Sequence, residues 1–318
     1  MGASMYTDVT ARAAHCLFKV DRVALDPEST SWKRHARWHQ AQWREARGHP
    51  IGAHPYAGGD GATLVGSRLA LEFAMRRKGE NFLTPAILGA VGDRLEKFEK
   101  HQMLREDRLW ADLLSSMPLC FNLFGDLFRN NEYATRAVRA WWPDAPQGSV
   151  AVRFEHSPAR CDPTFLGNKS AFDVAFEIGL GGEKRAIIGV ETKYHEHARV
   201  EPLPQPKALA RYTEVTERSS AFVEGWRELV IGTALQQIWL DHLLVLAMLQ
   251  HPSGQWSWGR FVLVYPSGNP SFARAAAAYR AVLRDPTTFQ TSTIEDILAT
   301  PGALDLATVA AFRERYFW

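Results

Sequence analysis

The feature that most constrains the fold is a run of three segments with the composition of β-strands. They are residues 149–155 (SVAVRFE), 172–178 (FDVAFEI) and 186–194 (AIIGVETKY), all rich in Val, Ile or Phe. A Gly-rich break, Gly181-Gly182, separates the second and third segments and favours a hairpin turn. A fourth strand is predicted at 259–265 (GRFVLVY), after a long helical pattern. This order predicts a mixed sheet flanked by helices.

Helical patterns surround these strands. Apolar residues recur every three to four positions across 83–130, which predicts a layer of helices, and a further helix is expected at 64–77. The alanine-rich segment 271–284 also has a helical pattern. Thr293 and Asp305 each precede a short apolar segment and are predicted to cap the last two helices.

The chain is therefore expected to be an α/β protein whose core has the order αβββαβ, with helical additions at both ends. With 318 residues, 46% of them hydrophobic, it can bury a large core. We predict a basic and aromatic arm at 1–60, a helical region packing on the core at 61–148, the sheet-containing core at 149–292 and C-terminal helices at 293–318.

Charge is nearly balanced over the whole chain but not locally. The 37 Lys and Arg residues against 35 Asp and Glu exclude a generally basic DNA-coating protein, so any nucleic-acid surface must be local. Residues 31–50 combine five Lys and Arg side chains with a single acid and three tryptophans, a mixture that can bind phosphate and stack on bases. The alternative is a helix whose tryptophans pack on the core and whose charges are solvated.

The cysteines and the N-terminus indicate a cytoplasmic protein. Cys16, Cys120 and Cys161 cannot all pair and show no CxxC spacing, which suits a reducing compartment. The first 25 residues lack the apolar stretch of a secretory signal. Residues 229–249 are strongly apolar, but polar side chains near the middle favour a buried helix over a membrane span. These are Gln236, Gln237, Asp241 and His242.

Two carboxylates and a lysine are predicted to meet at one end of the sheet. Asp173 lies near the start of the second strand, and Glu191 and Lys193 lie near the end of the third. Side chains alternate along a strand, so Glu191 and Lys193 share a face while Thr192 points away. In a hairpin that turns at Gly182, Asp173 and Glu191 lie nine residues from the turn on either side and come to face each other.

This arrangement suits a hard divalent cation such as Mg²⁺, which is usually held by one or two carboxylates together with phosphate oxygens and water. Asp173, Glu191 and the backbone carbonyl of Thr192 are the candidate ligands. Lys193 can orient or help deprotonate a water molecule and stabilise charge that grows on phosphorus. Phosphodiester hydrolysis is the reaction that these groups favour. The alternative is a solvated cross-strand ion pair. These charges, however, lie at the ends of apolar core strands, where a charged group is costly unless it has a partner or a function.

The order of these motifs resembles the PD-(D/E)XK nuclease superfamily, which has a restriction endonuclease-like fold. The chain is most similar to bacterial proteins classed as restriction endonucleases that carry an FE-x-SP segment, an FD strand and an ExKYxE motif. Here these are residues 154–158 (FEHSP), 172–173 and 191–196 (ETKYHE). The resemblance covers about residues 149–265, and residues 115–125 (SSMPLCFNLFG) are similar to the helix that precedes the core. Phe172 replaces the usual proline before the aspartate.

The resemblance implies a Mg²⁺-dependent endonuclease acting on DNA, with Mn²⁺ as a substitute, that leaves a 5′-phosphate and a 3′-hydroxyl. Asp173 and Glu191 would be metal ligands and Lys193 the catalytic lysine. Restriction or other defence against foreign DNA follows from the resemblance alone, and DNA repair and mobile-element processing stay open. Cleavage of two strands by this fold commonly uses two active sites, which makes a homodimer a candidate assembly.

Several positions around this site keep two interpretations. Glu155 is either an accessory acid or the partner of Arg153 or Lys193 in an ion pair. Superfamily members often present a glutamine from the helix after the third strand, and either Gln236 or Gln237 fits that position, but only one can face the site because adjacent helical positions are about 100° apart.

Two more sets of side chains are candidate contacts for phosphate. His195 and His197 reach phosphate or metal only if the third strand continues, and otherwise are solvated. Residues 31–50 and three further cations are expected to hold the DNA backbone. These are Lys169, Lys184 and Arg185.

Other reaction classes have little support in the sequence. A GxSxG nucleophile motif and a HExxH zinc motif are both absent, and Cys120 lies in an apolar segment typical of a core thiol. The remaining alternative to an active nuclease is a module that keeps the nuclease fold without turnover and binds DNA or a protein partner.

Overall fold

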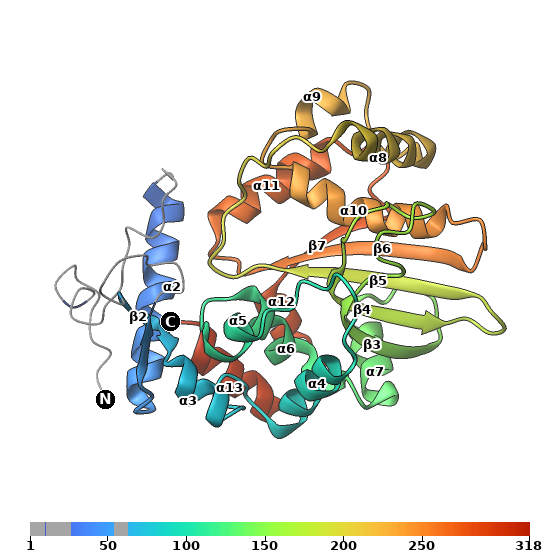
Figure 1. The fold of residues 1–318 in the computed structure, drawn as a ribbon. Helices are drawn as coiled ribbons and strands as arrows, with labels where there is room; N and C mark the ends of the chain where they lie inside the picture. Colours follow the sequence, from blue (N-terminus) through green and yellow to red (C-terminus); the bar gives the residue numbers. More distant parts are fainter. Residues whose placement is uncertain (1–9, 11–26, 54–62) are drawn as a thin grey trace.

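A five-stranded sheet crosses the centre of the computed structural model, which describes residue 10 and residues 27–53 and 63–318 (Figure 1). Its strands lie in the order β3-β4-β5-β6-β7. They are β3 (Ser149–His156), β4 (Phe172–Gly179), β5 (Arg185–Thr192), β6 (Trp256–Tyr265) and β7 (Phe289–Thr293). The expected sites before residue 27, including Cys16, lie outside the described residues.

The sheet is mixed, as the sequence predicts. β3 pairs with β4 and β4 with β5 in antiparallel fashion, whereas β5 pairs with β6 and β6 with β7 in parallel. Three helices form the crossover from β5 to β6: α8 (Pro206–Ser219), α9 (Trp226–Val230) and α10 (Gln236–Leu249). The parallel edge strand β7 was not predicted, because its sequence FQTST has no apolar pattern that distinguishes a strand.

The hairpin of β4 and β5 has the predicted register. Val174 pairs with Val190, so each strand lies symmetrically about Gly182. The turn residues Gly181 and Gly182 have φ angles of 95° and 54°, a region that favours glycine. This register brings the start of β4 beside the end of β5 and confirms the predicted placement of Asp173 and Glu191 at one end of the sheet.

Helices cover both faces of the sheet (Figure 1). One layer contains α8, α10 and α11 (Pro270–Ala281), and the opposite layer contains the helices from α4 to α7 together with α12 and α13. The second layer comprises α4 (Pro85–Glu96), α5 (Glu106–Ala111), α6 (Ser116–Phe124), α7 (Asn131–Trp141), α12 (Ile294–Ala299) and α13 (Leu306–Tyr316). Along β5, Ile188 and Val190 join the core on one face while Ile187 joins the core on the other. Burial on both faces explains why this strand is a continuous apolar run.

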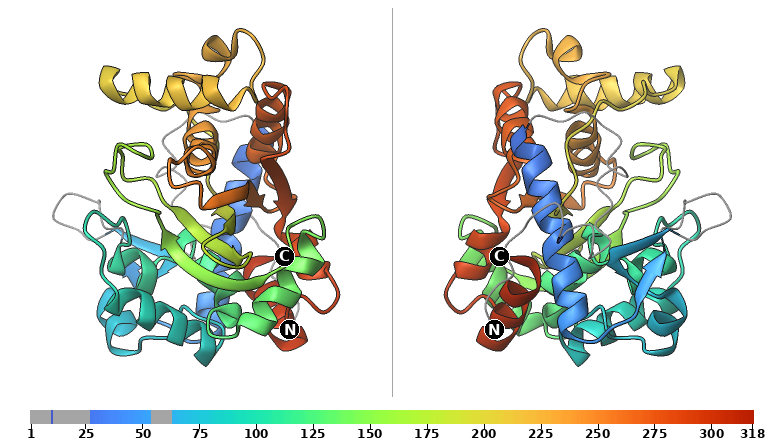
Figure 2. Two further views of the ribbon diagram at one scale, coloured as in Figure 1. Left: turned by 90° about the vertical axis from the view of Figure 1, so that its right-hand side faces the viewer. Right: turned by 90° about the vertical axis from the view of Figure 1, so that its left-hand side faces the viewer.

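The N-terminal arm begins, in the described residues, with the long helix α2 (Pro27–Ala46). It runs from beside α11 to beside α13 and packs on strand β2 (Leu64–Leu69) (Figure 2). Trp38 and Trp43 are buried, as the core-packing interpretation predicts. The expectation that the charges on this helix are solvated is wrong for three of them, because the helix packs with its basic face inward. These three buried side chains are Lys33, Arg37 and Arg44.

The prediction of one helix over 64–77 is wrong. Residues Leu64–Leu69 form strand β2, which pairs with β1 (Ile51–Ala53), and a short helix α3 follows at Leu71–Arg76. Gly52 lies so close to Leu69 that a Cβ atom there would meet the Leu69 carbonyl oxygen at 2.1 Å. Close pairing with β1 therefore overrides the local helical pattern.

The predicted caps and thiols agree with the structure. Thr293 and Asp296 form a capping box at the start of α12, and the Asp305 side chain accepts a hydrogen bond from the Ala307 N–H at the start of α13. Burial raises the pKa of Cys120 well above its usual value, which supports a core thiol. In the described part of the chain, no helix has both the length and the apolar character needed to cross a membrane.

Candidate active site

Asp173 and Glu191 meet where β4 begins and β5 ends. The Asp173 Oδ2 atom accepts hydrogen bonds from the Thr192 N–H at 2.8 Å and from the Thr192 hydroxyl at 2.7 Å. Thr192 therefore orients the Asp173 carboxylate, a contact that sequence reasoning did not predict. The pair fixes one aspartate oxygen on the backbone of β5.

Lys193 follows β5 directly and is held on the sheet. Its N–H donates to the Val264 carbonyl at 2.8 Å, and its Nζ lies 2.7 Å from the Glu191 Oε1. Burial on its own would lower the pKa of Lys193, but the nearby Glu191 and Asp241 carboxylates raise it above its ordinary value. These carboxylates therefore favour the charged form of the amine, which suits an orienting and charge-stabilising role.

The structure distinguishes the two glutamines at the start of α10. The Gln237 Nε2 lies 3.4 Å from the Glu191 Oε1 and donates to it. The Gln236 side chain is buried and turned away, donating to the Pro202 carbonyl at 2.8 Å and accepting from the Gly232 N–H at 2.8 Å. Gln237 is thus the residue that faces the candidate site.

Asp241 lies beside these residues and was missed as a site residue. It occurs on α10 four residues after Gln237, so the two side chains share one helix face. Burial raises the pKa of Asp241 well above its usual value, and the charge of Glu191 raises it further. The sequence signal for Asp241 is a carboxylate one helical turn after Gln237 in a strongly apolar helix.

The Glu155 side chain has partners other than those expected. Its Oε1 accepts hydrogen bonds from the Arg160 guanidinium at 3.1 Å and from the Met103 N–H at 3.2 Å. Arg153, one of the two ion-pair partners expected for it, pairs instead with Glu177 at 3.1 Å. Glu155 also has a φ angle of 48°, so the backbone of β3 is irregular where it passes Asp173.

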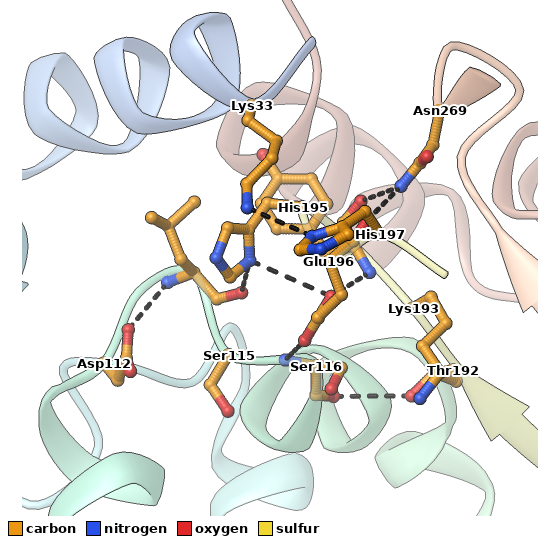
Figure 3. Close-up of polar contacts among 12 residues, drawn as sticks. Lys33, Asp112, Ser115, Ser116, Thr192, Lys193, His195, Glu196, His197 and Asn269 are labelled. Carbon is orange, nitrogen blue, oxygen red and sulfur yellow. Dashed lines mark hydrogen bonds and ion pairs between the residues drawn. The ribbon is translucent and has the colours of Figure 1, made fainter. Parts of the chain in front are cut away.

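Glu196 ties the end of β5 to helix α6 (Figure 3). Its Oε2 accepts from the Tyr194 N–H at 2.7 Å and its Oε1 from the Ser116 N–H at 3.3 Å. Burial would raise the pKa of Glu196, but His195, Lys193 and the backbone hydrogen bonds lower it to about 2. The segment after Lys193 is therefore anchored by a charged carboxylate.

The two histidines after β5 are not a solvated pair. The His195 Nδ1 lies 2.9 Å from the Leu114 carbonyl oxygen, and burial lowers the pKa of this histidine (Figure 3). The His197 Nδ1 lies 3.4 Å from the Lys33 Nζ on α2. Because β5 ends at Thr192, neither side chain follows the strand alternation that would carry it to the Asp173 and Glu191 pair.

Two of the expected backbone-holding cations lie far from this site. Lys184 and Arg185 are at the opposite end of β5, about 20 Å from Glu191 at the strand rise of 3.3 Å per residue. Lys184 donates to the Gly254 carbonyl at 2.7 Å, and Arg185 pairs with Glu177 at 2.5 Å. Lys169 is exposed in the loop that leads into β4, four residues before Asp173.

The donor set fits a divalent cation. Burial raises the pKa of Asp173 well above its usual value and Glu191 raises it further, so two close carboxylates disfavour each other's charge. Among the residues that the structure describes, no three His, Cys, Asp or Glu side chains converge into a complete metal cage. Mg²⁺ does not need one, since one or two carboxylates with water and substrate oxygens suffice.

Comparison with known proteins agrees with this geometry. The sequence profile of the PD-(D/E)XK nuclease superfamily matches residues 27–318, which includes the sheet, the helices on both faces and the helix α2. Comparisons with curated proteins and with solved structures give no match. A match over this length, on a chain whose mixed sheet has the expected order, identifies the family: the protein belongs to the PD-(D/E)XK nuclease superfamily.

Proposed function

We propose that the protein is a metal-dependent endonuclease that hydrolyses phosphodiester bonds of DNA. The observation that carries the proposal is the convergence of Asp173, Glu191 and Lys193 at one end of the sheet, with Lys193 2.7 Å from Glu191. Gln237 reaches the same carboxylate from α10. Membership in the nuclease superfamily supports the reaction class.

Asp173 and Glu191 would hold the metal ion, with the Thr192 carbonyl as a third candidate ligand. A bound Mg²⁺, or Mn²⁺ in its place, supplies Lewis-acid polarisation of the scissile phosphate and lowers the pKa of a bound water. Thr192 holds the Asp173 Oδ2 with two hydrogen bonds, which leaves the Oδ1 of the same carboxylate for the ion.

The remaining residues act on substrate and on the water. Lys193 carries a positive charge beside Glu191, where it orients the attacking water and stabilises the charge that grows on the phosphate oxygens. Gln237 donates to Glu191 and fixes its rotamer, as a supporting hydrogen bond does around many metal ligands.

The test is cleavage of supercoiled plasmid, linear duplex and single-stranded DNA with Mg²⁺, Mn²⁺ or EDTA. Asp173→Asn and Lys193→Ala are the site variants. Glu177→Gln is the matched control, because Glu177 is an ion-paired carboxylate on the same strand as Asp173 but at its other end. Linear product formed without a nicked intermediate would support a homodimer with two active sites.

We expect metal-dependent cleavage by the wild type and by Glu177→Gln, and none by the two site variants. If all four proteins bind DNA equally and none cleaves any substrate, the proposal fails in favour of a DNA-binding module with the nuclease fold. If Lys193→Ala cleaves as fast as the wild type, the assigned site is wrong.

A further inference from the structure

A cavity of about 540 Å³ opens beside the candidate active site. It lies between the loop that follows β5 and the helices α8 and α10, and Gln237 forms part of its wall. The same Gln237 side chain lies 3.4 Å from the Glu191 Oε1. A group in this cavity would therefore be separated from the candidate metal ligands by a single side chain.

The size and lining of the cavity suit one partly apolar group of nucleotide size. Its volume is within the range of about 300–1,000 Å³ that holds small ligands. Pro202, Pro204, Ala208 and Leu240 supply apolar wall. The cavity is too small for a duplex but admits one nucleotide.

Polar side chains that line the cavity can pair with the edge of a nucleobase. Gln205, the residue before α8, makes no capping hydrogen bond with that helix, so its amide is available to the cavity. A glutamine amide can both donate to and accept from a base edge. Arg199 at the rim is paired with Glu201 at 2.8 Å but remains largely exposed, which leaves its guanidinium accessible to a phosphate.

The loop that forms this rim also exposes two large apolar side chains. Val200 and Leu203 are 69% and 67% exposed, beside a site that contains charged groups. Exposed apolar side chains next to a nucleic-acid site can enter between base steps and unstack them. In this loop they flank the residues that line the cavity.

We propose that this cavity receives an unpaired or extruded nucleobase of the DNA strand beside the scissile phosphate, with Val200 and Leu203 inserted into the gap that it leaves. The inference rests on the proposed function, because it assumes that DNA occupies the candidate active site. It specifies the substrate class as DNA that carries an unpaired nucleotide near the cleaved bond. Such a base avoids the cost of being taken out of the stack.

The experiment measures binding without cleavage. The Lys193→Ala protein in EDTA is titrated into two duplexes of the same sequence, one fully paired and one with a single unpaired 2-aminopurine. We expect the second duplex to bind roughly tenfold tighter, with a change in 2-aminopurine fluorescence as the base leaves its neighbours.

Two pairs of variants in this background test the cavity and the loop. Ala208→Phe fills the cavity, whereas Ala210→Phe on the exposed side of the same helix does not. Val200→Ser with Leu203→Ser removes the apolar side chains, and Leu306→Ser, at an 85% exposed position elsewhere, is its control. We expect Ala208→Phe and the double serine variant to lose the preference for the unpaired base and the two controls to keep it.

The inference is overturned if both duplexes bind equally, or if the preference survives Ala208→Phe. Neither result depends on turnover, so both leave the proposed nuclease activity to be judged by the plasmid assay. Conversely, a wild-type protein that never cleaves DNA but shows the preference would remove the nuclease proposal and reduce the cavity to a binding site for an unpaired base, with no scissile phosphate beside it.

Discussion

Gln236 and Gln237 are adjacent in sequence and have different partners, which allows a direct comparison of two substitutions. Gln236→Ala leaves the Gly232 N–H and the Pro202 carbonyl without their partner, so we expect unfolding free energy to fall by about 1–3 kcal/mol. Gln237→Ala removes the support of Glu191, so we expect a cleavage rate about 10- to 100-fold lower with stability changed by less than about 0.5 kcal/mol. Urea unfolding and metal-dependent plasmid cleavage check both values. Equal rate losses in the two variants would contradict the assignment.

Glu196 makes stability depend on pH in a defined direction. Its pKa is about 2 in the folded protein against an ordinary 4.5, so it contributes stability above pH 4.5 that is lost as pH falls toward 2. The shift corresponds to about 3 kcal/mol. We expect Glu196→Gln to be less stable than the wild type at pH 7 by about this amount and nearly equal to it near pH 2, measured by chemical unfolding across that range. The exposed Glu314→Gln is the control, and a wild-type advantage that is constant with pH would contradict the prediction.

At the scale of elements, the sequence predicts the hairpin of β4 and β5 that carries the candidate site, but not the α10 side chains that approach this hairpin. The register of β4 and β5 follows from two local signals, the apolar runs and the Gly181-Gly182 turn. The contact of Gln237 with Glu191 and the proximity of Asp241 depend on how α10 is rotated against the sheet. The apolar residues of α10 occur around most of its circumference, so no helical pattern fixes that rotation.

Gly189 tests how tightly this hairpin positions the candidate site, and Gly92 on α4 is the control. A Cβ atom on Gly189 of β5 would lie 2.3 Å from the ring of Phe172, the residue before Asp173. We expect Gly189→Ala to cost about 1–3 kcal/mol of stability and to reduce cleavage, because Phe172 must move. Gly92 of α4 has no atom within 4 Å of such a Cβ, so Gly92→Ala should stabilise the protein by about 0.5–1 kcal/mol and leave cleavage unchanged. Thermal unfolding and cleavage assays decide, and a stable, active Gly189→Ala protein would contradict this packing.

At the scale of the whole molecule, all four predicted segments contribute to one core. The cluster on one face of the sheet includes Trp43, Leu109, Val190 and Phe312, one from each segment. The superfamily profile also extends over residues 27–318. Sequence patterns indicate many of the helices but not these contacts, because the contacts join residues far apart in the chain. Stability of the arm and of the C-terminal helices is therefore expected to be coupled to that of the sheet.

Arg315 offers a test of this coupling. It is fully buried on α13, donates to the Asn81 carbonyl at 3.1 Å and lies over the Trp43 ring at 4.1 Å, so it joins the C-terminal helix to α2 and to the loop before α4. We expect Arg315→Met to lower the unfolding free energy by at least about 2 kcal/mol, because it takes the Arg315 donor from the buried Asn81 side-chain oxygen. Arg313→Met, an exposed position on the same helix, should change it by less than about 0.5 kcal/mol.

The shape of the Arg315→Met unfolding curve tests whether the whole molecule unfolds as one unit. If α2, α13 and the sheet form one cooperative unit, tryptophan fluorescence and circular dichroism will show a single transition at a lower urea concentration. Cleavage below that transition should then match the wild type, since Arg315 does not contact Asp173, Glu191 or Lys193. A separate early transition in fluorescence, with cleavage intact beyond it, would show instead that the helices at the two ends are appended to a site that is stable without them.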